Sequence, residues 1–170
     1  LGDCLRVVPF PHLRRNPLAN VQHSALTGAD LHEPKGAAAA AAGRAYVADG
    51  AASGAWTALQ DIYTGVISNV STAETIYIPV ANAGTVSKVV TVLESAITTA
   101  DATLTAKNAA GTSMGTITVT QSGSAAGDVD TLAPVANHTV AANDAITIET
   151  DGSSASSARV WFTFVVDRTS

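Results

Sequence analysis

RVWFTFVV, residues 159–166, is the stretch of sequence that decides the fold. Its aromatic and β-branched residues favour an extended backbone. Phe162 and Phe164 are two residues apart, so they share one face of a strand. No other stretch with strand character is as apolar, and we therefore predict that it forms a central strand.

Shorter stretches before it show the same strand character. The clearest is TITVT, residues 116–120, which places Ile117 and Val119 on one face and three threonines on the other. Segments rich in Asn, Asp, Gly and Ser separate the stretches and predict turns. The other expected strands are residues 75–80, 86–93, 102–107 and 145–150, with a weaker one at 62–70.

This pattern predicts an all-β fold for residues 60–170. Seven or eight short strands at this spacing are typical of an antiparallel β-sandwich or a jelly-roll-like domain. The only helix we consider is a single turn within residues 94–101. Pro79 lacks a backbone donor, so the strand at 75–80 is expected to end there or to lie at a sheet edge.

Residues 37–59 are rich in alanine and glycine. A run of six alanines has a high helix propensity, but so short a helix is marginal by itself. Tyr46 with Val47, and Trp56 with Thr57, form brief strand-like islands. We interpret this segment as a linker that becomes ordered against its neighbours.

Residues 1–36 are expected to form an extended arm that contacts another protein. They hold Pro9, Pro11, Pro17 and Pro34, four of the six prolines in the chain, and proline interrupts both helices and sheets. The arm also carries many apolar residues, which a disordered tail would lack. Docking along a partner covers these side chains, and a disordered tail is the alternative.

The charge pattern limits the choice of partners. Charged residues make up 14% of the chain and the net charge is −5, with the acidic excess after residue 36. We find no basic patch that could neutralise several phosphates, so nucleic acid is not an expected partner. The alanine run is far shorter than the roughly 20 residues of a membrane helix, so no membrane is expected either.

The N-terminal region adds two expectations. No apolar signal-peptide region is evident in residues 1–36, and because the chain begins with Leu1 we expect processing or preceding residues. Cys4 is the only cysteine, so a disulfide within the chain is impossible. We interpret Cys4 as a buried thiol; a reactive or intermolecular thiol is the alternative.

Few residues suggest catalysis. Three of the four histidines lie in the arm, and His138 is interpreted as a solvated loop residue. Asp128 and Asp130 could contribute to a calcium site, but Asp is also a common turn residue. We prefer the turn interpretation, and we expect no metal, no cofactor and no enzymatic activity.

Several motifs resemble the structural proteins of tailed bacteriophages, of the head decoration, head-fibre or tail-fibre-like kind. They are ALTGADLHEPKG (residues 25–36), AYVADG (45–50) and SGAWT (53–57). ITTAD (97–101), ITVTQSGSAAGDVD (117–130) and DAITIETDG (144–152) resemble the β-domain of the same phage proteins. The resemblance covers most of the chain after His23.

The resemblance implies a capsid decoration, or cement, protein on the exterior of the virion, where it stabilises the shell. Its partners would be the major capsid protein and other copies of itself, as a homotrimer. The arm would bind the shell and the β-domain would face outward. The expected shell contacts are Phe10, Leu13, Leu26, Leu31, His32 and Pro34. Tyr46 and Trp56 are expected at the junction between subunits.

Two other non-enzymatic functions stay open. A head-fibre, tail-fibre or spike module would bind host-surface glycans through exposed aromatic residues, and Tyr63, Tyr77 and Trp161 are the candidates in the β-domain. At least one of them is expected in the core. A cellular adhesin or cell-wall module would require a signal peptide. A hydrolase ranks last, because no catalytic constellation is recognisable.

Overall fold

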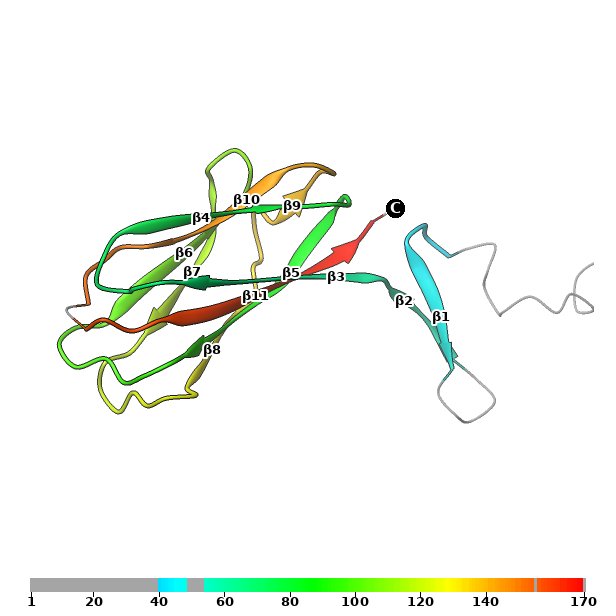
Figure 1. The fold of residues 1–170 in the computed structure, drawn as a ribbon. Helices are drawn as coiled ribbons and strands as arrows, with labels where there is room; N and C mark the ends of the chain where they lie inside the picture. Colours follow the sequence, from blue (N-terminus) through cyan, green and yellow to red (C-terminus); the bar gives the residue numbers. More distant parts are fainter. Residues whose placement is uncertain (1–39, 49–53, 155, 170) are drawn as a thin grey trace, which may run out of the picture. The chain divides into compact units, whose positions relative to one another are not determined.

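After residue 59 the chain forms two antiparallel sheets that pack face to face (Figure 1). The computed structural model describes residues 40–48, 54–154 and 156–169. The first sheet has the order β4 (Glu74–Pro79), β10 (Ala145–Thr150), β6 (Ala102–Lys107), β7 (Ser113–Val119). The second has the order β3 (Gln60–Ile67), β11 (Val160–Arg168), β5 (Gly84–Leu93), β8 (Val129–Leu132), and β9 (Thr139–Val140) also pairs with β5. The predicted antiparallel β-sandwich is confirmed.

The strands follow the alternation seen in the sequence. The predicted strands at 102–107 and 145–150 coincide with β6 and β10, and β11 lies between β3 and β5 as expected of a central strand. β8 and β9 were not predicted, because each is too short to show a clear period. The helical turn considered for residues 94–101 does not form; the chain there makes bends.

Phe162 and Phe164 fill the core from the inward face of β11. Both are buried, their ring centroids are 5.9 Å apart, and the rings meet edge to face at 87°. Gly65 is the Cα partner of Phe162 on β3, and a Cβ there would lie 2.4 Å from the Phe162 Cζ atom. The ring therefore packs directly on the backbone of β3. From the other sheet, Ile146 and Ile148 are fully buried.

A polar network at Asp61 ties β3 to β11 and to the turn after β4. Arg168 forms an ion pair with Asp61, and its Nε donates to Asp61 Oδ1 at 2.9 Å. Asn82 Nδ2 donates to Asp61 Oδ2 at 2.9 Å. The Tyr63 hydroxyl accepts from the Ala81 amide at 2.9 Å and contacts Asp61 Oδ2 at 3.4 Å. The Arg168 and Asn82 hydrogen bonds lower the pKa of Asp61.

β4 is an edge strand, as Pro79 predicted. It pairs with β10 on one side and has no partner strand on the other among the described residues. The Val80 amide donates to the Asp144 carbonyl at 2.8 Å. Because amides alternate in direction along a strand, the donor missing at Pro79 would have pointed away from β10. The proline thus removes a hydrogen-bond donor from the open edge.

The segment predicted as a linker contains a separate two-stranded hairpin. β1 (Arg44–Ala48) pairs with β2 (Gly54–Ala58) over all five residues of each strand. The two strand-like islands are therefore longer than expected, and they pair with each other. No described segment forms a helix of the length and apolarity that a membrane span requires.

Candidate functional site

The predicted shell contacts lie outside the described residues. These are Phe10, Leu13, Leu26, Leu31, His32 and Pro34, and Cys4 also lies outside. Their roles stay predictions.

Tyr46 and Trp56, the predicted subunit-junction residues, are brought together by the hairpin. They are direct Cα partners, and their ring centroids are 5.4 Å apart at an interplanar angle of 66°. Gly54 makes room for this arrangement, because a Cβ there would lie 2.8 Å from Tyr46 Cε1 and 2.4 Å from the Val47 carbonyl oxygen. Arg44 Nη1 donates to the Trp56 carbonyl oxygen at 3.2 Å. The hairpin thus presents an aromatic pair on one face.

Four aspartates in the loops of the sandwich accept hydrogen bonds from backbone amides, which supports the turn interpretation. Asp101 Oδ1 accepts from Gln121, Asp128 Oδ2 from Ala125, and Asp144 Oδ2 from Ala141, at 2.6–2.7 Å. Asp151 Oδ1 accepts from Ser153 at 3.1 Å and from Thr103 at 3.3 Å. Burial opposes the ionisation of Asp151, but these hydrogen bonds outweigh it and lower its pKa.

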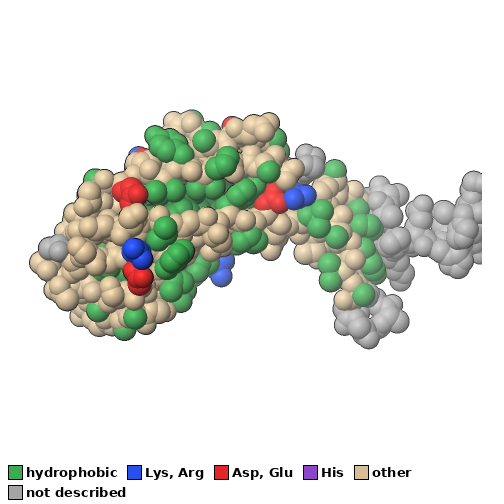
Figure 2. All heavy atoms as spheres, viewed as in Figure 1, with side chains coloured by type: hydrophobic (Ala, Val, Ile, Leu, Met, Phe, Trp, Pro, Cys, Tyr) green, Lys and Arg blue, Asp and Glu red, His purple; other side chains and the backbone are tan. Residues whose placement is uncertain are grey.

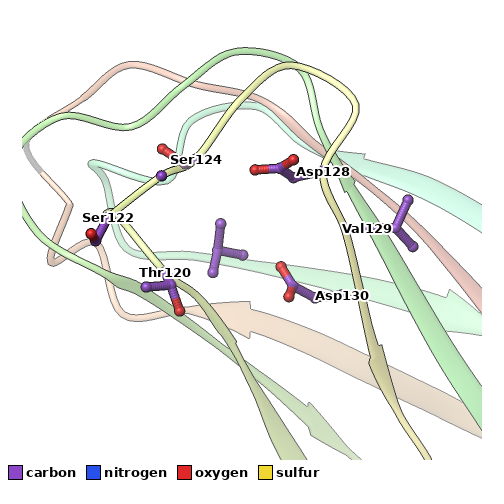
Figure 3. Close-up of a pocket in the computed structure, with 8 residues that line it drawn as sticks. Thr120, Ser122, Ser124, Asp128, Val129 and Asp130 are labelled. Carbon is purple, nitrogen blue, oxygen red and sulfur yellow. The ribbon is translucent and has the colours of Figure 1, made fainter.

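A polar hollow of about 190 Å³ lies between the loop after β7 and the start of β8 (Figure 3). Asp128 and Asp130 direct their carboxylates toward the loop that carries Thr120 and Ser124. The Ser124 hydroxyl is already used, since it bonds the Ile97 amide and carbonyl at 3.0 Å each. Burial, with repulsion from Asp128, raises the pKa of Asp130. The ionised carboxylate of Asp130 in the polar hollow therefore destabilises the folded state.

The hydrogen bonds in the polar hollow favour the turn interpretation of Asp128 over a calcium site. Calcium takes six to eight oxygen ligands, and Asp128 is committed to the Ala125 amide. Within the described ranges, no group of three or more His, Cys, Asp or Glu side chains is placed to hold a metal ion.

His138 differs from the expectation of a solvated loop residue. It is half-buried, and its Nδ1 is shut off from solvent with no hydrogen-bond partner in the described structure. The carbonyl of His138 accepts from the Val86 amide at 2.8 Å, next to the β5–β9 pairing. This pairing draws the residue against the sheet, which the turn-like sequence around it did not indicate.

A second hollow, which we call the Tyr77 groove, lies on the outer face of the four-stranded sheet. Its volume is about 410 Å³, and Tyr77, on its border, is 71% exposed. Thr147 is the Cα partner of both Tyr77 and Lys107, so the three side chains form a row across β4, β10 and β6. Lys107 forms an ion pair with Glu149, and the turn at residues 108–111 forms a wall.

The outer face of the five-stranded sheet carries a row of apolar side chains. Val66, Trp161, Val92 and Val129 are successive Cα partners on β3, β11, β5 and β8. Trp161 is 51% exposed and Val129 is 59% exposed. On the side of the molecule in Figure 2, charged side chains are few and scattered among hydrophobic and uncharged groups.

Sequence reasoning did not bring the members of the Tyr77 groove together. Lys107 and Glu149 are far apart in the chain and meet only because Glu149 lies on β10 beside β6. One sequence feature could have pointed to this groove: Tyr77 stands between Ile76 and Ile78, so the alternation of the strand directs its side chain outward. Of the three aromatic candidates for glycan contact, Tyr63 packs against the core, whereas Tyr77 and Trp161 are exposed.

Comparison with known proteins finds similar chains among solved structures. No protein-family model matches the chain, and no curated protein matches it. Among solved structures, the chain is similar to CsCBM6-3 from Clostridium stercorarium, determined in complex with cellobiose. The TM-score is 0.32 and the identity 17%, over 76% of this chain and 84% of that chain.

Proposed function

We propose that this protein is a capsid decoration protein of a tailed bacteriophage, located on the exterior of the virion. The observation that carries the proposal is the resemblance of residues 25–36, ALTGADLHEPKG, and of the motifs after them to phage structural proteins. In this proposal the arm, residues 1–36, binds the major capsid protein and the β-sandwich faces outward.

The organisation of the described residues supports separate roles for the arm and the β-sandwich. The hydrophobic core is built from residues of both sheets and their connecting loops, between Ile67 and Val166. In this proposal the apolar residues of the arm cover a partner surface. Many weak arm contacts, repeated over a shell, would add up to tight binding and would stabilise the assembled particle.

Self-association, as a homotrimer, is the second part of the proposal, and the hairpin supports it. An isolated two-stranded hairpin is marginally stable in water and gains from a covering surface. The Tyr46–Trp56 pair offers such a contact, since aromatic side chains contribute strongly to interfaces. We propose that this pair packs at the junction between subunits.

The proposed role is structural, without catalysis, cofactor or nucleic acid. Four loop aspartates accept hydrogen bonds from backbone amides and so stabilise turns, which explains their presence without a catalytic role. They are Asp101, Asp128, Asp144 and Asp151. The net charge of −5 would repel a phosphate backbone.

Shell binding tests the proposal directly. Phage shells that lack this protein would be incubated with the full chain and with a chain lacking residues 1–36, and occupancy would be measured after sedimentation. We expect the deletion to lower the apparent affinity by on the order of 10²-fold or more, because the repeated contacts are lost together.

A substituted full-length chain guards against a folding artefact. It carries serine at Phe10, Leu13, Leu26 and Leu31, so its length is unchanged. We expect the same loss of occupancy, while circular dichroism reports an unchanged β-sandwich. Wild-type occupancy by either variant would rule out arm-mediated docking.

A fibre or spike module that binds host-surface glycans is the second candidate. The observation in its favour is the exposure of two aromatic side chains, Tyr77 at 71% and Trp161 at 51%, on the outer faces of the two sheets. Such side chains provide an apolar body for a ligand.

A further inference from the structure

We propose that the Tyr77 groove binds a neutral saccharide. This inference rests on the second candidate function, glycan binding, and assigns it to one surface. It does not depend on the arm, so shell docking and saccharide binding can succeed or fail separately.

The Tyr77 ring supplies an apolar platform on a sheet that is otherwise polar at this point. The side chain is 71% exposed. An exposed aromatic side chain stays in contact with water unless a ligand covers it, so its burial favours binding. A pyranose ring has an apolar C–H face that can stack on it.

The Lys107–Glu149 pair supplies the polar contacts at the opposite side of the row. Their side chains are 28% and 31% exposed, so they can still reach a ligand. Lysine has three donors and a carboxylate has several acceptor positions, so the ion pair leaves both partly unused. Adjacent sugar hydroxyls can accept from Lys107 and donate to Glu149 at the same time.

The spacing across the sheet suits one sugar unit between platform and ion pair. Tyr77, Thr147 and Lys107 lie on three neighbouring strands, so the outer two backbones are about 10 Å apart. Thr147 between them is only 8% exposed and forms the floor. A ring lying over Thr147 would touch Tyr77 on one side and the ion pair on the other.

The wall of the groove is held in place before any ligand arrives. Asn108 Oδ1 accepts from the amides of Ala110 and Thr112 at 3.1 and 3.0 Å, and Asn108 Nδ2 donates to the Asn137 carbonyl at 3.0 Å. The Gly111 amide donates to the Asn108 carbonyl at 2.9 Å. A preformed wall lowers the entropy cost of binding.

The charges select a neutral ligand. Lys107 and Glu149 neutralise each other, and the other residues that line the groove are uncharged. An anionic sugar would meet no unpaired cation there. A cationic ligand would meet no unpaired carboxylate.

The test measures binding of the full-length protein to a panel of neutral hexasaccharides of glucose, galactose and N-acetylglucosamine by titration calorimetry. We expect at least one to bind, and Tyr77→Ala to weaken its binding at least about tenfold. Tyr77→Phe keeps the platform and is expected to retain binding within about threefold. Val135→Ala, at a 91% exposed side chain outside the groove, is the control and should leave binding unchanged.

Several outcomes would overturn the proposal. They are no binding of any hexasaccharide in the panel, equal binding by Tyr77→Ala, and loss of binding in Trp161→Ala, which would place the site on the other sheet. Binding of uronic-acid or sialylated oligosaccharides alone, tested beside the neutral panel, would also overturn it. Tyr77 is largely exposed, so a thermal scan should show Tyr77→Ala folded like the parent. Shell occupancy of the same variants separates this result from the capsid proposal, which survives if only saccharide binding fails.

Discussion

Asp61 concentrates more polar contacts than any other described side chain at the β3–β11 junction. Its side chain is only 13% exposed and is bonded by Arg168, Asn82 and Tyr63. We expect Asp61→Asn to lower the free energy of unfolding at pH 7 by about 1–2 kcal/mol, since charge-assisted hydrogen bonds are lost. Urea denaturation of parent and variant measures the difference.

The pH dependence of this effect has a definite sign. The pKa of Asp61 is lowered in the folded state, so its stabilisation is complete above the usual pKa of 3.8 and disappears as the pH falls through the folded-state pKa. The gap between parent and Asp61→Asn should therefore shrink below pH 4. A gap that stays constant down to pH 2 would show that shape, and not charge, matters at this position.

Asp130 should respond in the opposite direction. Burial and the neighbouring Asp128 raise its pKa, so at neutral pH the ionised carboxylate destabilises the folded state. We expect Asp130→Asn to stabilise the protein at pH 7 by less than about 1 kcal/mol, because the group is partly solvated.

Measuring the stability of Asp130→Asn at low pH provides the control for this prediction. Below pH 3.8 the carboxyl is protonated in both the folded and the unfolded state, so the advantage of Asp130→Asn should vanish there. Thermal unfolding at pH 7 and pH 3 measures both values. Destabilisation at pH 7 would mean that the carboxylate makes a favourable contact instead.

At the scale of single elements, β4 shows how one residue protects a sheet edge. Pro79 removes the donor that would point away from β10. We expect Pro79→Val to restore this donor and to increase aggregation, which light scattering at high protein concentration would detect. Thr75→Val, on the same strand, adds a similar apolar side chain without a new donor and should aggregate less. Equal aggregation of the two variants would refute the role of the missing donor.

The hairpin offers the matching test for self-association. Trp56→Ala removes the edge-to-face partner of Tyr46, a pair worth about 1 kcal/mol beyond its buried area. We expect a lower mean molar mass in solution by multi-angle light scattering. Ala55→Ser, on the opposite face of β2, is the control and should keep the parent mass. A mass unchanged in Trp56→Ala would place the subunit contact elsewhere.

Strands with a clear period were predictable, and strands without one were not. The sequence located β6 and β10 to the residue: β6 alternates buried and half-buried positions, and β10 alternates isoleucine with polar residues, although Thr147 is also buried. VDTL in β8 puts a carboxylate at the position that faces the sheet interior, and β9 has two residues. Both form because β5 presents a long edge for pairing, which no local pattern reveals.

At the scale of the whole molecule, the sandwich could be predicted but its binding surfaces could not. The Tyr77 groove depends on the register that places Thr147 opposite both Tyr77 and Lys107. The apolar row through Trp161 likewise depends on three successive pairings. Register arises from tertiary packing, so a single sequence shows which side chains face outward but not which of them meet. The predicted arm contacts lie outside the described residues, and their roles stay predictions.

The pairing of Gln60 with Asp167 has a practical consequence for engineering. The start of β3 and the end of β11 lie at one end of the sandwich, so a cargo fused after Arg168 would emerge beside Gln60. The loops at residues 68–73, 94–101 and 120–128 lie at the other end of the strands (Figure 1). Ala125 and Ala126, both exposed there, are therefore the better place to insert a foreign epitope that must remain accessible.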